Sequence, residues 1–349
     1  MTKSLMHREL FETPERLREQ LAANAPHADD ITRTLNETTP TQWFVVGRGT
    51  SDHAGSFFRY ASGLLRGCIV GDLSPSLMTV YDRSPSFIDG FLIAISQSGA
   101  GSDINHVVSE FTAGGGLTLA LTNDADSALA HAAKFTLPLH MGPETAVAAT
   151  KTFLGTLTAL LQLLAISNSD DKLTQCLSAL PDRLSQAAGE GQARIDTQAL
   201  SRFSSPLFVI GRGLGLPIAR EVALKFKEVC VMHAEAYSAA EFKHGPLALV
   251  GSACPILILS LDDETRPQTL DLAREADALG APVVVVGPDL PAPPDDTNVS
   301  YRSLPITGSI YTDAVMASFL LYDVIERLAL DRGIDPDEPP HIQKVTSTY

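Results

Sequence analysis

The chain has 349 residues, of which 44% are hydrophobic and 19% charged, a composition typical of a globular protein with enough length for two domains. Acidic residues outnumber basic ones by 41 to 26, and the net charge of −15, without a cluster of lysines or arginines, argues against nucleic acid or an anionic membrane surface as partner. No uncharged apolar stretch reaches the ~20 residues that a membrane span needs.

Helices and strands are expected to alternate along the first half. Residues 1–40 form a helical segment, in which Thr13-Pro14-Glu15 is typical of a cap followed by proline at the first helical position. Short apolar strands are then expected at 43–46, 68–70, 91–95, 117–121 and 135–139, with helices at 51–65, 103–112, 127–133 and 146–167. Such alternation indicates a parallel sheet that helices cover on both faces.

The second half repeats the first. The phrase Phe-Val-Val-Gly-Arg-Gly at 44–49 returns as Phe-Val-Ile-Gly-Arg-Gly at 208–213, which is 164 positions later. At the same offset, the apolar runs 91–95 and 117–121 return as 255–259 and 281–285. We therefore predict an α/β protein with two tandem, doubly wound parallel-sheet lobes of the flavodoxin-like kind, produced by an internal duplication.

This pattern predicts five parts. They are an N-terminal helical segment (1–40), the first copy (41–168), a helical connector (169–204), the second copy (205–332) and a C-terminal tail (333–349). The tail contains a Pro-rich acidic stretch from Asp335 to Pro340 that cannot be helical at its start. On composition alone the tail would pass for a disordered end.

The four cysteines, Cys68, Cys176, Cys230 and Cys254, are scattered, with no CxxC motif and no histidine pair at metal-ligand spacing. We expect reduced, buried thiols and no bound metal. The first ten residues carry charges and no apolar core, so they do not resemble a signal peptide. These features together predict a cytoplasmic protein.

Two loops of the first copy are small, hydroxyl-rich and glycine-rich. Gly47-Arg48-Gly49-Thr50-Ser51 follows the first strand, and Ser96-Gln97-Ser98-Gly99-Ala100-Gly101-Ser102 follows the third. Ligands of parallel sheets bind beyond the carboxyl ends of the strands, where helix N-termini present free N–H groups. Either loop alone could be an ordinary helix cap. Two of them at neighbouring strand ends, absent from the second copy, favour an anion site, and neither matches a nucleotide-binding motif.

A helix of the second copy carries a second candidate cluster. Glu221, Lys225 and Glu228 follow an i, i+4, i+7 spacing and therefore share one helix face. Such spacing is more often a solvated ladder of ion pairs. Here it is followed by His244, which precedes Gly-Pro in a turn and is expected to be an exposed imidazole, a side chain of the kind that suits proton transfer. The glutamate, lysine and histidine are candidates for proton transfer.

Several motifs together resemble the double sugar-isomerase (SIS) family. They are Ser96-Gln97-Ser98-Gly99, Ala223-Leu224-Lys225-Phe226-Lys227-Glu228, His233-Ala234-Glu235-Ala236-Tyr237, Glu241-Phe242-Lys243-His244-Gly245-Pro246-Leu247-Ala248 and Gln343-Lys344-Val345-Thr346. The similarity extends from about residue 40 to the C-terminus. The same module forms the isomerase half of glutamine–fructose-6-phosphate aminotransferase, and free-standing versions of it resemble a type of glucosamine-6-phosphate deaminase.

The resemblance implies roles for the matching positions. Residues that would hold the sugar phosphate or line its site are Gly49, Thr50, Ser51, Ser96, Gln97, Ser98, Ser102, Val147, Ala148 and Glu221. Glu228 would move a proton between C1 and C2 with Lys225 beside it, and His244 would assist ring opening. Lys344 would meet the open-chain carbonyl, as an amine can through a Schiff base. The resemblance further implies a homodimer and no metal or organic cofactor.

Two departures from the family pattern bear on the reaction. Relatives usually have Glu-Thr or Arg-Ser after Ser-Gln-Ser-Gly, whereas this chain has Ala100-Gly101, so a phosphate-binding hydroxyl is missing unless Ser102 replaces it. The sequence shows no glutaminase domain and no cysteine near residue 1. We therefore expect deamination of glucosamine 6-phosphate to fructose 6-phosphate and ammonia. A fructosamine-6-phosphate deglycase, ammonia-dependent synthesis in the reverse direction, and a non-catalytic protein that senses sugar phosphates are the alternatives.

Overall fold

The computed structural model describes residues 3–189, 195, 197–201, 203, 206–293 and 297–344. The chain divides into two lobes. The first lobe contains Glu12–Thr145, Lys151–Pro181 and the chain from Gln343 on, and the second lobe contains the chain up to Phe11, Ala146–Thr150 and Asp182–Ile342. Within the described residues, none of the helices has both the length and the apolar character that crossing a membrane requires.

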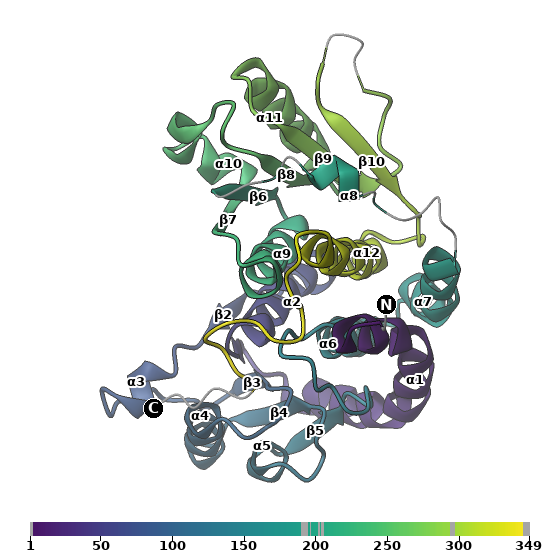
Figure 1. Cartoon of the computed structure of the whole chain (residues 1–349). Coiled ribbons are helices and arrows are strands. Elements are labelled where there is room, and N and C mark those ends of the chain that lie inside the picture. Colours follow the sequence, from purple (N-terminus) through teal and green to yellow (C-terminus); the bar gives the residue numbers. More distant parts are fainter. Residues whose placement is uncertain are drawn as a thin grey trace. The chain divides into compact units, whose positions relative to one another are not determined.

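The first lobe contains a five-stranded parallel sheet with the order β2-β1-β3-β4-β5. Its strands are β1 (Gln42–Val46), β2 (Val70–Asp72), β3 (Gly90–Ile95), β4 (Leu117–Thr122) and β5 (Phe135–Pro138). Its helices are α2 (Thr50–Arg66), α3 (Ser76–Thr79), α4 (Ser102–Ala113), α5 (Ala128–Ala132) and α6 (Lys151–Ser167). Helices α2 and α6 lie on one face and α4 and α5 on the other (Figure 1). Every residue of the central strand β3 is buried, which explains its continuous apolar run.

The second lobe contains a parallel sheet with the order β10-β9-β8-β6-β7. Its strands are β6 (Leu207–Gly211), β7 (Ala234–Ser238), β8 (Ile256–Leu259), β9 (Val283–Pro288) and β10 (Ser300–Leu304). Its helices are α8 (Thr197–Leu200), α9 (Gly215–Cys230), α10 (Ala239–Phe242), the short 3-10 helix η1 (Pro246–Leu249), α11 (Arg266–Ala278) and α12 (Ile310–Asp331). The strands of both sheets follow the same order when they are counted from the start of each copy. The predicted fold class, with a duplicated α/β unit, is confirmed.

Helices α1 (Leu5–Thr38) and α7 (Asp171–Gly189) each contribute residues to both lobes. The prediction that a cap at Thr13 begins a helix is wrong, because α1 continues through Pro14. A proline inside a helix removes one backbone hydrogen bond and crowds the carbonyl four residues earlier. Leu10, Thr13 and Leu17 are fully or almost fully buried around this point, so side-chain packing holds the helix together despite the proline.

The helix predicted at 146–167 begins later, at Lys151. The preceding glutamate, Glu144, accepts hydrogen bonds from the backbone N–H of Thr152 (3.1 Å) and from its hydroxyl (2.7 Å). A carboxylate at this position satisfies a free N–H group and interacts favourably with the positive end of the helix dipole. Residues before Lys151 are therefore left as a loop.

The Pro-rich part of the tail is anchored. The Asp337 carboxylate accepts hydrogen bonds from the backbone N–H groups of Leu5 (2.6 Å) and Met6 (2.9 Å) at the first turn of α1. This caps the helix in the way that an N-terminal aspartate usually does, although it comes from a residue more than 300 positions away. Composition alone is thus a poor guide for the tail up to Lys344, whereas 345–349 lie outside the described residues.

All four cysteines are free, as expected. Cys230 and Cys254 are buried, but Cys68 and Cys176 are only partly buried, so the expectation of four buried thiols is correct for two of them. Burial raises the pKa of the Cys230 thiol to about 12, although Arg332 has the opposite effect. That thiol is therefore protonated at neutral pH.

Candidate active site

The two hydroxyl-rich loops lie at the same edge of the first sheet. Strands β1 and β3 are neighbours in parallel register, with Val46 opposite Ala94, so the loops that follow them leave the sheet side by side. Helix α2 begins at Thr50 and helix α4 begins at Ser102, directly after these loops. The N-termini of both helices therefore contribute to the edge at which ligands of parallel sheets bind.

The 96–102 loop is held by its own hydroxyls. Ser96 accepts a hydrogen bond from the Gly99 N–H (3.2 Å), and Ser98 accepts one from the Ala100 N–H (3.3 Å). A hydroxyl that accepts a bond in this way can still donate its proton to a phosphate oxygen. Gly99 has a φ of +61°, and a Cβ atom there would lie 2.2 Å from the Ser127 hydroxyl oxygen, so only glycine fits.

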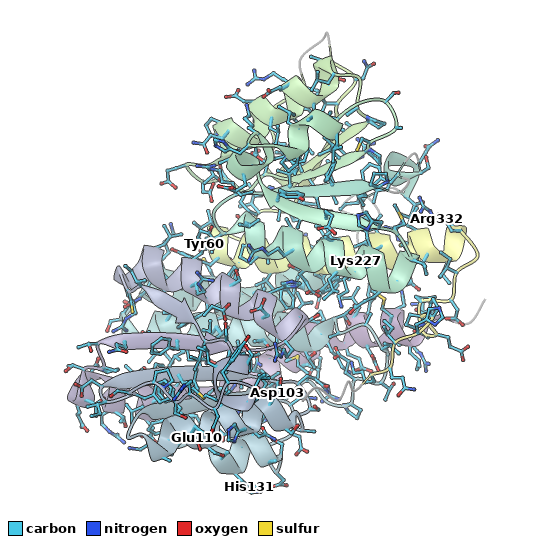
Figure 2. All side chains as sticks on the ribbon, turned by 90° about the vertical axis from the view of Figure 1, so that its left-hand side faces the viewer. Tyr60, Asp103, Glu110, His131, Lys227 and Arg332 are labelled. Atoms are coloured by element: carbon cyan, nitrogen blue, oxygen red, sulfur yellow. The ribbon has the colours of Figure 1, made fainter. Side chains whose placement is uncertain are left out.

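An ion pair connects the two loops. Arg48 extends from the first loop to Asp103, the second residue of α4, and both its Nε and Nη2 atoms lie 2.9 Å from Oδ2 of Asp103. The Asp103 side chain is buried, with 2% exposed, whereas that of Arg48 is 52% exposed. Figure 2 shows Asp103 at the start of α4. Neither residue was among the predicted site residues.

Asn123, which follows β4, connects the 96–102 loop with the loop after β5. Its backbone N–H donates to the Gln97 carbonyl (3.0 Å). Its side chain accepts from the Met141 N–H (2.9 Å) and donates to the Gly142 carbonyl (2.7 Å). This single side chain therefore fixes the position of the backbone that leads to Glu144.

Glu144 pairs with the predicted catalytic lysine of the tail. Lys344 Nζ lies 2.9 Å from Oε2 of Glu144, whose side chain is fully buried, while 21% of the lysine side chain is exposed. Burial by itself would raise the pKa of Glu144, but the Lys344 ammonium and the two hydrogen bonds from Thr152 outweigh it and lower the pKa below the usual 4.5. The Glu144 carboxylate is therefore ionised at neutral pH, where it pairs with Lys344.

A pH dependence of stability follows from this pair. Because the pKa of Glu144 is lowered in the folded state, its contribution to stability is complete above pH 4.5 and is lost as the pH falls through the folded-state value. Removing one partner of a buried ion pair costs about 3–5 kcal/mol. We expect Glu144→Gln to lower the free energy of unfolding by an amount in or just below that range at pH 7. The difference from wild type should narrow below pH 4.5 in urea denaturation. A difference that stays constant down to pH 3 would contradict this role.

The second lobe contains the predicted acid–base cluster on α9. Lys225 is completely buried, with its ammonium paired to Glu228 and 3.4 Å from Oε1 of Glu221. Glu221 is also completely buried and accepts a hydrogen bond from the Tyr322 hydroxyl (2.9 Å) of α12. The solvated ladder that such spacing usually forms is therefore wrong for this helix. Lys227, on the same helix, is exposed, by contrast (Figure 2).

Burial would lower the pKa of Lys225, but the Glu221 and Glu228 carboxylates outweigh this and raise it above the usual 10.5. The lysine therefore stays an ammonium and cannot act as a base. Of the three side chains, only that of Glu228 is partly exposed, at 22%. Glu228 is thus the member of the cluster that a ligand can reach, and Glu221 is better placed to support Lys225 than to make its predicted contact with substrate.

The remaining predicted residues are placed as follows. His244 lies exposed in the turn between α10 and η1, where its backbone N–H donates to the Glu241 carbonyl (3.0 Å). Val147 is partly buried and Ala148 buried in the segment of the loop before α6 that belongs to the second lobe. The first lobe thus gathers the predicted phosphate loops and Lys344, and the second lobe holds the α9 cluster, His244, Val147 and Ala148.

Sequence reasoning missed Arg48, Asp103, Asn123 and Glu144. Arg48 stands inside a loop that the sequence had already singled out, and its charge was a signal that could have been used. Asn123 and Glu144 had no such signal, because Asn123 bonds residues of another loop, 18 and 19 positions away, and Lys344 is 200 positions from Glu144.

Comparison with known proteins is consistent with this geometry. The family model described as the SIS domain matches residues 39–166 and 204–324. A glutamine–fructose-6-phosphate aminotransferase (isomerizing) from Aeropyrum pernix is 36% identical in an alignment 318 positions long, which covers 87% of this chain and 50% of that protein. The chain thus spans about half the length of this relative.

Two solved structures cover nearly all of the chain. A protein described as a phosphosugar isomerase from Silicibacter pomeroyi is 35% identical with a TM-score of 0.85, and the match covers 96% of this chain and 100% of that one. The C-terminal domain of glucosamine-fructose-6-phosphate aminotransferase from Francisella tularensis is 26% identical with a TM-score of 0.83, covering 97% and 99%.

Proposed function

The chain belongs to the SIS-domain family, and from this premise we propose that it is a sugar-phosphate isomerase that deaminates an amino-sugar phosphate. The favoured reaction converts glucosamine 6-phosphate and water to fructose 6-phosphate and ammonia. The observation that carries the proposal is the α9 cluster, in which a buried ammonium holds one reachable carboxylate. The predicted homodimer, cytoplasmic location and lack of a metal or organic cofactor stay predictions.

The proposed chemistry needs a group that moves a proton between adjacent carbons of the open-chain sugar. Glu228 suits this role because a carboxylate can take a proton from one carbon and return it to the next. The Lys225 ammonium beside it would hold the Glu228 carboxylate in position. His244 would assist ring opening, and Lys344 would engage the carbonyl, as the family resemblance implies.

The phosphate would bind at the first sheet edge, where a double substitution tests the loop. We expect Ser96→Ala combined with Ser98→Ala to raise KM for glucosamine 6-phosphate far more than it lowers kcat, because these hydroxyls would bind substrate and transition state alike. Steady-state kinetics of ammonia release measure both parameters. An unchanged KM would leave the loop as a plain helix cap. Ser109→Ala, on the exposed side of α4, is a matched control.

The function itself is tested by ammonia release across a panel of amino-sugar phosphates. Release from glucosamine 6-phosphate with matching formation of fructose 6-phosphate is the expected result. Release of a free amine from a fructosamine 6-phosphate instead would identify the deglycase alternative. Binding without turnover of any member of the panel would favour the non-catalytic sensor and reject the proposal.

A further inference from the structure

Arg48 is the only charged residue in the two hydroxyl-rich loops, 47–51 and 96–102. The protein has a net charge of −15, so a dianionic phosphate approaches against an unfavourable overall field. Backbone N–H groups and hydroxyls offset part of this cost, but a guanidinium forms shorter and stronger charge-assisted hydrogen bonds. Arg48 is therefore the residue of the two hydroxyl-rich loops that could bind a phosphate most strongly.

The ion pair leaves one edge of the guanidinium for a ligand. Two of its five N–H donors are directed at Oδ2 of Asp103, through Nε and Nη2. The remaining donors, two on Nη1 and one on Nη2, have no hydrogen-bond partner in the part of the chain that the structure describes. Nη1 and Nη2 together form the fork that binds two phosphate oxygens at once.

Burial differs between the two partners in a way that suits this arrangement. Asp103 is covered, whereas half of the Arg48 side chain is exposed in a cleft of about 300 Å³ that Gly47, Gly49 and Ser74 also line. A buried carboxylate can orient the arginine, while the exposed part of the guanidinium stays accessible to a ligand. The cleft also contains Asp52 and Asp72, which repel anions. We therefore expect the phosphate at the end of the guanidinium nearest Asp103 and the start of α4, away from these two carboxylates.

Gly101 gives an independent reason for a cation here. It stands where relatives have a hydroxyl side chain, and a Cβ atom at this position would lie 3.3 Å from Oδ1 of Asp103. Asp103, the ion-pair partner of Arg48, therefore borders the position of the missing hydroxyl. A guanidinium held by Asp103 could supply a charge-assisted hydrogen bond to the phosphate in place of the one that the hydroxyl would make.

We propose that Arg48 binds the phosphate group of the substrate through its free Nη1–Nη2 edge and that Asp103 is the residue that positions it. The inference rests on the proposed function, since it assigns a phosphate ligand to the same site. It also names a specificity determinant, because the arginine would distinguish a phosphorylated sugar from its unphosphorylated form.

Calorimetric binding of fructose 6-phosphate and of inorganic phosphate tests this directly. Arg48→Gln is expected to weaken the binding of both ligands about 10- to 100-fold, which is the effect expected when hydrogen bonds between charged groups are lost. Arg48→Lys keeps the charge but loses the fork, and should fall between that variant and wild type. Asp103→Asn should weaken binding less than Arg48→Gln. Arg33→Gln, which breaks an exposed pair with Asp30 on α1, is the matched control.

Kinetics separate this role from a structural one. If the proposal is right, KM for glucosamine 6-phosphate rises with the dissociation constant in Arg48→Gln while kcat changes little. Phosphate binding within threefold of wild type in both Arg48 variants, or a loss of kcat at unchanged KM, would overturn it. A wild-type protein that releases no ammonia but binds fructose 6-phosphate through Arg48 would reject the deaminase function and leave this inference standing.

Discussion

Glu228→Gln is expected to lose about 10²–10⁴ in kcat while binding sugar phosphate as well as wild type does. Glutamine has nearly the same size and exposure, but it cannot take up the proton that moves between the two carbons. The loops proposed to bind phosphate belong to the other lobe and are untouched by the substitution. The effect should therefore appear in turnover and not in the calorimetric affinity for fructose 6-phosphate.

The buried neighbour of Glu228 makes a stability control necessary. The substitution leaves the Lys225 ammonium with Glu221 as its remaining carboxylate partner, so some loss of stability is expected. Thermal unfolding must show that the variant is folded at the assay temperature. Glu110→Gln changes a partly exposed carboxylate on α4 that accepts a hydrogen bond from Ser84, and should keep full activity (Figure 2). Turnover of Glu228→Gln within a few-fold of wild type would remove this residue from the mechanism.

The architecture was predictable because it follows from patterns between residues that are close together in the sequence and from the internal repeat. Apolar strands such as 91–95 alternate with amphipathic helices, and the constant offset between the copies fixes the strand count of each lobe. The hydroxyl-rich loops could be placed together for the same reason, since the carboxyl ends of adjacent parallel strands meet at one edge.

The polar network could not be predicted, because its partners are far apart in the sequence. Glu144 pairs with Lys344, 200 positions away, and Asp337 caps a helix that begins at Leu5. The i, i+4, i+7 spacing on α9 is the same for a solvated ladder and a buried cluster. What distinguishes them is burial, and α9 is buried on nearly all sides, including Val222 and Phe226 on its apolar face.

The second large effect is expected from the tail. Truncation after Pro340 removes Lys344 but keeps Asp337, so the cap on α1 is retained. If Lys344 engages the carbonyl, ammonia release at saturating glucosamine 6-phosphate should fall about 10²–10⁴-fold, the usual cost of removing a group that takes part in the chemistry. Thermal stability should fall as well, because the truncation leaves the buried Glu144 carboxylate without the Lys344 ammonium.

Lys344→Arg separates the chemical role from the anchoring role. A guanidinium can keep the ion pair with Glu144, so thermal stability should stay close to that of wild type. It remains protonated at neutral pH and cannot attack a carbonyl, so activity should be as low as in the truncated enzyme. Full activity of the truncated enzyme would show that the residues after Pro340 take no part in the reaction. Activity in Lys344→Arg but not in the truncated enzyme would mean that the position needs a positive charge, held by Glu144, and not a nucleophilic amine.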